Sequence, residues 1–202
     1  LAQRHAVGEI PRSRFQSACV EARIGGQKCL LMKPTTYMNR SGQAVGEAVR
    51  FYKLQPAEDL IVVVDELAFP VGHVRVRAKG GTAGHNGLKS IDGILGGADY
   101  PRVRIGIGSK PAMMNQADWV LSRVTEDEWP DFDRSIGKAA DAVESILADG
   151  IDNAMNRHNE RLTPDQKPDK PPKTHPKQEK PADDPPNGSA DGQPGIHPGW
   201  TA

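Results

Sequence analysis

One unbroken apolar run constrains the fold of this chain more than any other feature. Residues 60–64 read Leu-Ile-Val-Val-Val, mostly β-branched and without polar alternation, and Asp65 follows directly. Such a strand is typical of a parallel sheet, in which both faces of the strand are buried. Ligands of open α/β sheets bind at the carboxyl ends of these strands. The run therefore predicts an α/β fold, a single domain with a mixed, mostly parallel sheet sandwiched by helices, and it marks Asp65 as a candidate functional residue.

Further elements are predicted on both sides of this run. Two segments at 14–24 and 28–32 flank Gly25-Gly26 and indicate a β-hairpin. Ser41 is expected to cap a helix that runs to about Tyr52. The remaining expected elements are strands near 74–78 and 103–107, each with one basic side, and helices near 88–95, 136–147 and 151–159.

The composition of the chain changes at about residue 160. Residues 161–202 contain 10 of the 17 prolines and few aliphatic residues, so we expect disorder there. Residues 1–160 are enough for one domain with a sizeable core. Cys19 and Cys29 stand alone, which favours a reducing compartment, and no apolar run approaches the roughly 20 residues of a membrane span. We therefore expect a cytoplasmic monomer with no membrane partner.

Charge is unevenly distributed along the chain, although the net charge is zero. Residues 71–110 contain seven basic and two acidic side chains, whereas residues 124–150 contain two basic and eight acidic ones. A basic region of this kind can hold a polyanion. Arg77 and Arg104 are expected on the polar sides of their strands, and they would form a phosphate clamp if they converged. The alternative is two unrelated arginines on an ordinary charged surface.

Three short polar blocks stand at the edges of apolar elements: Pro-Thr-Thr-Tyr-Met-Asn at 34–39, Val-Asp-Glu-Leu at 64–67 and Gly-His-Asn-Gly at 84–87. Asp65 can orient an imidazole, as the acid of a catalytic triad does, or it can serve as a cap or a structural ion pair. Asn39 and Asn86 can donate to an oxyanion or a ribose, or they can close turns. Glu66 is expected to face away from Asp65 as a surface or loop residue.

Cofactor and metal motifs are missing from the sequence. The glycine-rich stretch at 80–87 is not followed by Gly-Lys-Ser/Thr, as a Walker loop would be, and it does not read Gly-x-Gly-x-x-Gly. The six histidines show no metal-binding spacing. We therefore expect no cofactor and no metal site.

Four blocks together resemble the bacterial peptidyl-tRNA hydrolase family. They are the three polar blocks, extended to 34–42, 64–67 and 84–89, and Arg-Val-Arg-Ile-Gly-Ile-Gly at 102–108. Ala-Met-Asn-Arg at 154–157 is similar to the family's C-terminal helix. The resemblance covers about residues 1–159. It implies hydrolysis, without a metal, of the ester between a peptide and the 3′ ribose of tRNA, which recycles the tRNA after aborted translation.

The resemblance also implies roles for particular residues. Asp65 matches the carboxylate that stabilises the catalytic histidine, and Asn86 matches the amide that holds the attacking water or the ribose. Two further positions, Tyr37 and Asn39, match contacts to the 3′ end of the substrate. The clamp on the 5′ phosphate corresponds to Arg77 and Arg104.

One part of the family pattern is not found in the sequence. The family opens with a buried strand, a Gly-x-Asn-Pro-Gly turn and an Arg-His-Asn segment that carries the catalytic base. We expect that an N-terminal segment with the first strand and the base is missing from this chain, and whether it exists upstream of Leu1 stays open. His5 lies in a segment similar to the end of the helix that follows the catalytic histidine, and we expect it to be a surface residue. His85 belongs to the block at 84–87 and does not match the base.

Three readings of the function remain open at this point. The first is a peptidyl-tRNA hydrolase that is nearly inactive as the chain stands. The second is a non-catalytic RNA-binding relative that kept the arginine strands, and the sequence upstream of Leu1 would distinguish the two. The third is an unrelated α/β protein in which the blocks coincide by chance.

Overall fold

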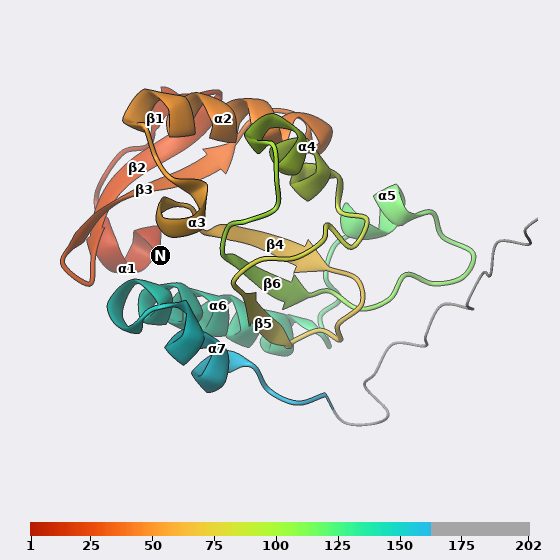
Figure 1. Cartoon of the computed structure of the whole chain (residues 1–202). Coiled ribbons are helices and arrows are strands. Elements are labelled where there is room, and N and C mark those ends of the chain that lie inside the picture. Colours follow the sequence, from red (N-terminus) through yellow and green to blue (C-terminus); the bar gives the residue numbers. More distant parts are fainter. Residues whose placement is uncertain (163–202) are drawn as a thin grey trace, which may run out of the picture. The chain divides into compact units, whose positions relative to one another are not determined.

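The computed structural model describes residues 1–162, which form two three-stranded sheets with helices around them (Figure 1). The predicted disordered segment at 161–202 lies almost entirely outside the described residues. In chain order the elements are α1 Ala2–His5, β1 Arg12–Arg14, β2 Ser17–Ile24, β3 Gln27–Pro34, the 3-10 helix η1 Met38–Arg40, α2 Ser41–Tyr52, α3 Pro56–Asp59, β4 Val62–Glu66, β5 Val74–Arg77, α4 Asn86–Leu95, β6 Arg102–Gly106, α5 Gln116–Val120, α6 Trp129–Asp149 and α7 Ile151–His158.

The first sheet is an antiparallel meander in the order β1-β2-β3. The predicted hairpin around Gly25-Gly26 is confirmed: Ile24 pairs with Gln27, and both glycines have positive φ (56° and 81°). A second tight turn joins β1 to β2, where Phe15 and Gln16 also have positive φ. Non-glycine residues rarely adopt this conformation, which is why the sequence did not reveal that turn.

The second sheet has the order β4-β6-β5, and it corrects the expectation of a mostly parallel sheet. Strand β4 is parallel to β6, but β5 is antiparallel to β6, and both pairings of the first sheet are antiparallel. Antiparallel strands need only a short connection, whereas a parallel pair needs a crossover, which α4 and β5 provide between β4 and β6. The α/β class is confirmed, with mixed strand directions.

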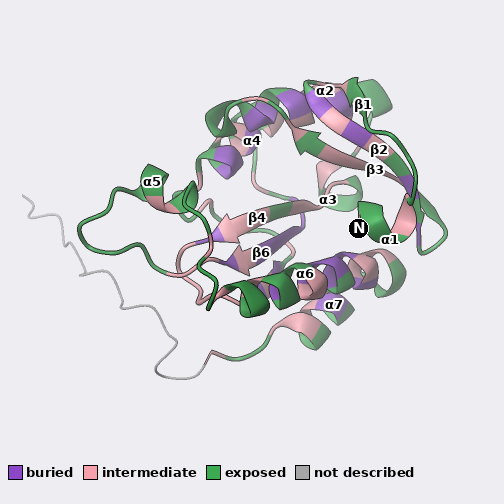
Figure 2. Cartoon of the chain, turned by 180° about the vertical axis from the view of Figure 1, so that it is seen from behind, coloured by how far each residue is buried: buried purple, intermediate pink, exposed green. Residues whose placement is uncertain are grey.

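The strand predicted to be buried on both faces is less buried than its sequence suggests. Val63 is 46% exposed, and Val62 and Val64 are half-buried (Figure 2). The physical reason is position, because β4 lies at an edge of the described sheet and α6 packs against β5 and β6 instead.

Two apolar cores hold the second sheet. Val74, Val76 and Val103 pack against alanines and a valine of α6 and Ala154 of α7. On α4, Leu88 and Ile91 pack with Tyr100 and with half-buried residues of β4 and α2. No helix in the described part of the chain is long and apolar enough to cross a membrane.

The helix at 41–52 is confirmed, but the way it begins differs from the prediction. Ser41 is the first residue of α2 and not its cap; its hydroxyl donates to the carbonyl of Met38 (2.9 Å) and secures the preceding turn. At the other end, Lys53 adopts the left-handed conformation that ends the helix. Pro56 begins α3 and does not itself close α2.

Candidate active site

Asp65 lies at the carboxyl end of β4, as predicted, and its partner is a histidine from the next helix. Oδ1 of Asp65 is 3.1 Å from Nε2 of His85, the residue that precedes α4. This hydrogen bond lowers the pKa of the Asp65 carboxyl below its ordinary value, and it outweighs burial, which acts in the opposite direction. About a third (34%) of the Asp65 side chain remains exposed. The carboxylate is therefore charged at neutral pH and reachable from solvent.

Both ring nitrogens of His85 are engaged. Nδ1 accepts a hydrogen bond from the backbone N–H of Leu88 (3.1 Å), so His85 caps the N-terminus of α4. Nδ1 must then be unprotonated, and the proton on Nε2 points to Asp65. No lone pair of this imidazole is left to accept a proton from water. His85 thus fixes the carboxylate, but in this arrangement it is not a base.

A glycine allows the block at 34–39 to meet the block at 84–87. A Cβ on Gly87 would lie 2.7 Å from Sδ of Met38 and 2.8 Å from Cε1 of His85. Close approach continues one turn into the helices, where a Cβ on Gly42 would lie 2.1 Å from the carbonyl oxygen of Ser90. Only glycine permits contacts this short. The three polar blocks, separate in sequence, are therefore gathered at one place.

The predicted substrate-binding side chains belong to the blocks that meet at this place, and they are exposed. Tyr37 is 81% exposed, and Asn39 in η1 and Asn86 at the start of α4 are exposed too. None of the three has a side-chain hydrogen bond among those found in the described residues. Asn39 and Asn86 do not serve as helix caps, because the residues at the cap positions of η1 and α4 are Tyr37 and His85. Their amides are free to bind a ligand.

Four arginines share one face of β5 and β6. In the antiparallel register Arg75 lies opposite Arg104 and Arg77 opposite Arg102, and directly opposed residues project from the same face. Arg77 is exposed, and its pKa is lowered by partial burial and by the charges of Arg75 and Arg104. The prediction of arginines on one side of each strand is confirmed. We call these four residues the arginine face.

Burial of the arginine face differs from the prediction. Arg102 and Arg104 are buried (0% and 9% exposed). Arg104 donates to Glu66, which is also buried, and both arginines donate to the carbonyl of Gly81 (3.3 Å from Arg102, 2.5 Å from Arg104). Glu66 is therefore not a surface residue: a buried guanidinium needs a paired anion, and Glu66 provides it. Two cations thus hold the loop that leads to His85.

The other histidines of the described residues lie away from Asp65. His5 is partly exposed and pairs with Glu144 on α6 (2.9 Å). His73 is buried beside Phe69, and His158 contacts Ser145 (2.8 Å). Within residues 1–162 no cluster of three or more His, Cys, Asp and Glu side chains is arranged to hold a metal ion.

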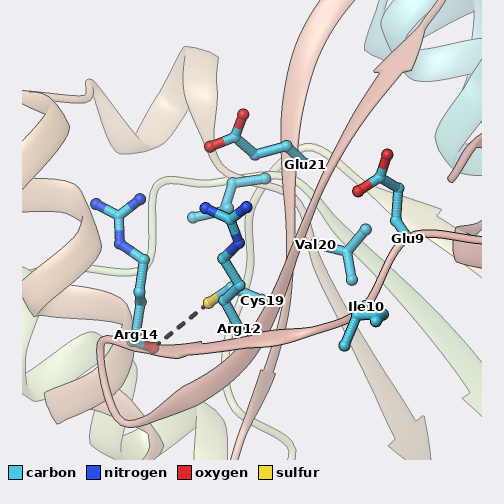
Figure 3. A pocket seen from close by; sticks show the side chains of 8 residues that line it. Glu9, Ile10, Arg12, Arg14, Cys19, Val20 and Glu21 are labelled. Carbon is cyan, nitrogen blue, oxygen red and sulfur yellow. Dashed lines mark hydrogen bonds between the residues drawn. The ribbon is translucent and has the colours of Figure 1, made fainter.

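A small cavity of about 130 Å³ lies elsewhere, on the first sheet (Figure 3). Side chains of Arg12, Arg14, Cys19 and Glu21 line it, and the Cys19 thiol donates to the carbonyl of Arg14 (3.4 Å). Burial raises the pKa of this thiol, so it is a poor nucleophile. No residue of the three polar blocks lines the cavity.

Comparison with known proteins decides the family. The family profile described as peptidyl-tRNA hydrolase matches residues 1–167 of this chain. The chain belongs to the peptidyl-tRNA hydrolase family. A peptidyl-tRNA hydrolase of Chloroflexus aurantiacus is 45% identical over 159 residues, which cover 79% of this chain and 84% of the relative. A peptidyl-tRNA hydrolase of Alkaliphilus oremlandii is 42% identical over 159 residues, which again cover 79% of this chain and 84% of the relative. The crystal structure of the Acinetobacter baumannii enzyme has a TM-score of 0.69 and 31% identity, and the match covers 78% of this chain and 80% of that one.

Membership in the peptidyl-tRNA hydrolase family does not by itself assign roles to residues, so those of Asp65, Tyr37, Asn39, Asn86, Arg77 and Arg104 stay predictions. The structure brings Asp65 against His85, and it brings Met38, which lies between Tyr37 and Asn39, against Gly87, which follows Asn86. It places the two arginines on one face. Sequence reasoning missed that His85 is the partner of Asp65. A partial signal was present, because His85 lies three residues before the helix predicted near 88–95, close to the position where side chains cap backbone N–H groups; in the structure α4 begins at Asn86, directly after His85.

Proposed function

We propose that this chain hydrolyses the ester that joins the peptide to the 3′ ribose of tRNA in peptidyl-tRNA. The observation that carries the proposal is the convergence of three polar blocks around the half-exposed Asp65 carboxylate, which the loop from Gly81 to His85 links to the arginine face. Ester hydrolysis needs an oriented base for water and amide donors for the oxyanion. The substrate additionally needs a surface for phosphates, which positions it without reading sequence.

The proposed roles are those that the resemblance to the family implies, and the exposure and charge of these residues support them. Asp65 orients an imidazole through Oδ2, the oxygen that His85 does not use. That imidazole takes a proton from water, and the water oxygen attacks the ester carbon. The bond from this carbon to the ribose oxygen then breaks, the imidazolium returns the proton to the ribose oxygen, and the products are the 3′ hydroxyl of tRNA and the peptide with a free carboxyl group. Asn86 holds the water or the ribose, and Tyr37 and Asn39 contact the 3′ end. We place this reaction in the cytoplasm and ascribe it to a monomer.

The arginine face supports a role in binding phosphate. Like charges directly opposite each other on two strands destabilise the pairing. Four arginines stand in such positions here, and Glu66 is the acid that hydrogen-bonds to them, through Arg104. The buried Nε atoms of Arg75, Arg102 and Arg104 have no hydrogen-bond partner among the described residues. A bound phosphate would relieve this excess of positive charge. Arg77, the exposed member, is proposed as the direct contact to the 5′ phosphate, with Arg104 beside it.

A test measures release of tRNA from an N-acetylaminoacyl-tRNA by the 202-residue chain and by Asp65→Asn. The proposal expects release to depend on Asp65 and to be slow unless a base is supplied, because His85 has no free nitrogen. Release that is unaffected by Asp65→Asn would contradict it.

One observation favours a second candidate, a non-catalytic RNA-binding relative: no histidine in residues 1–162 is placed as a free base at Asp65. This reading expects salt-dependent tRNA binding with no hydrolysis under any condition. The identity of the residues encoded upstream of Leu1 separates the two candidates, because the hydrolase requires a Gly-x-Asn-Pro-Gly turn and an Arg-His-Asn segment there.

A further inference from the structure

Asn159 hydrogen-bonds to the edge of β5 that faces away from β6. The backbone N–H of Val76 donates to Oδ1 of Asn159 (2.7 Å), and Nδ2 of Asn159 donates to the carbonyl of Val76 (3.1 Å). Strand β5 has β6 on one side, and alternate residues of such a strand turn their backbone groups outward. One side-chain amide therefore satisfies both outward groups of Val76, as a paired strand would.

The residues on either side of Asn159 are held to α6. Nε2 of His158 lies 2.8 Å from the hydroxyl of Ser145. The ammonium of Lys138 donates to Glu160 (2.9 Å). Three consecutive residues, 158–160, thus each contact a different partner, and we call them the C-terminal clasp.

The C-terminal clasp lies behind the arginine face. Val76 is fully buried against Val103 and the helices, and its two neighbours in β5 are Arg75 and Arg77. Because side chains alternate along a strand, a fixed backbone at Val76 also fixes the positions from which Arg75 and Arg77 project on the opposite side. The repulsion between Arg75 and Arg104, and between Arg77 and Arg102, pushes β5 away from β6. The two hydrogen bonds of Asn159 fix the outer edge of β5 to a segment that α6 holds, so the strand keeps one position despite this repulsion.

We propose that Asn159 is a positioning residue for RNA binding: it completes the outer edge of β5 and thereby holds Arg77 in place for phosphate. The inference rests on the proposed function, because it assumes that the arginine face binds the phosphates of tRNA. It adds a residue that touches neither the RNA nor the reacting atoms.

The test compares tRNA binding by the full chain and by Asn159→Ala across a range of salt concentrations. We expect the Kd to rise about five- to tenfold and the slope of log Kobs against log salt to fall by about 1, the loss of one phosphate contact. A merely structural role would lower the folded fraction and leave the slope unchanged. The matched control is Asn153→Ala on α7, an exposed amide that donates to the carbonyl of Asp149, for which we expect an unchanged Kd and slope.

A double-mutant cycle with Arg77→Gln makes the test sharper. If Asn159 acts through Arg77, Asn159→Ala has little further effect on Kd in the Arg77→Gln chain. Additive effects would overturn the proposal. Should Asn159→Ala not fold, Asn159→Asp keeps the volume and the acceptor but loses the donor, and we expect the same direction of change.

Hydrogen exchange separates the failure of this inference from the failure of the proposed function. The amide of Val76 should exchange faster in Asn159→Ala than in the parent chain, whether or not RNA binds. If the parent chain binds tRNA and Asn159→Ala binds it with the same Kd and slope, the positioning role is wrong and the proposed function stands. If the parent chain shows no salt-dependent binding of tRNA, both are wrong.

Discussion

Two neighbouring carboxylates at the end of β4 have opposite surroundings. Asp65 is 34% exposed and shares a hydrogen bond with His85, whereas Glu66 is 7% exposed and pairs with Arg104. Strand alternation directs them to different sides. A buried ion pair holds structure, because breaking it leaves a charge without water or partner. A half-exposed carboxylate costs little to keep charged and remains open to a ligand. The difference shows that exposure, and not residue type, separates the candidate catalytic group from the structural one.

The largest expected effect follows from breaking the buried pair. Glu66→Ala should lower the free energy of unfolding by about 3 kcal/mol, because Arg104 stays buried without its anion. Denaturant unfolding measures this. The control, Asp131→Ala, removes the exposed pair with Arg134 and should cost less than about 1 kcal/mol. Equal losses in the two variants would show that the Glu66 pair is not structural.

Asp65→Asn should separate activity from stability. We expect the hydrolysis of N-acetylaminoacyl-tRNA, measured with added imidazole, to fall by about 100-fold or more, equivalent to about 2.7 kcal/mol in the barrier. The free energy of unfolding should change by less than about 1 kcal/mol, because the pair with His85 is partly exposed. A large loss of stability with unchanged turnover would show that Asp65, like Glu66, has a structural role and does not act in hydrolysis.

Gly87→Ala tests the contact that joins two of the polar blocks. The added Cβ meets Met38 and His85, and we expect a loss of about 1–2 kcal/mol in unfolding free energy, since Met38 can move in part. On the same helix, Gly93→Ala meets nothing within 4 Å and should stabilise by about 0.5–1 kcal/mol. If both variants gain stability, the close approach is not as tight as described.

The smallest expected effect is a dependence of stability on pH. The pKa of Asp65 is lowered in the folded state, so its contribution is present above its ordinary value near 3.8 and is lost as pH falls through the folded-state pKa. The difference in unfolding free energy between the parent chain and Asp65→Asn should therefore be constant above about pH 5 and shrink below about pH 4. A difference that grows on acidification would mean that His85 does not stabilise the carboxylate.

Local patterns in the sequence were sufficient to predict most elements of the fold. The Gly-Gly hairpin, α2, α4, α6 and the strands with alternating valines all follow from spacing and turn residues. Burial was harder to foresee. The run at 60–64 reads as a strand covered on both faces, but coverage depends on which helices pack against it, and α6 packs against β5 and β6 instead.

For the candidate site, the sequence identified the blocks but not their pairing. Asp65, Asn39 and Asn86 stand out because polar residues interrupt apolar elements. That His85 bonds Asp65 depends on where the loop at 80–85 lies, and that Glu66 bonds Arg104 depends on the pairing of β4 with β6. Asn159 carries no local signal at all, because its role arises from contact with Val76, 83 residues away. Contacts of this kind belong to the tertiary fold and are not encoded in spacing.

The most direct test of the central claim is the dependence of tRNA release on added imidazole. The account holds that Asp65 orients a base other than His85, so free imidazole bound at Asp65 should raise the rate of release from N-acetylaminoacyl-tRNA by the 202-residue chain, and Asp65→Asn should abolish that rise. Fast release without imidazole that disappears in His85→Asn would contradict the account and would make His85 the base.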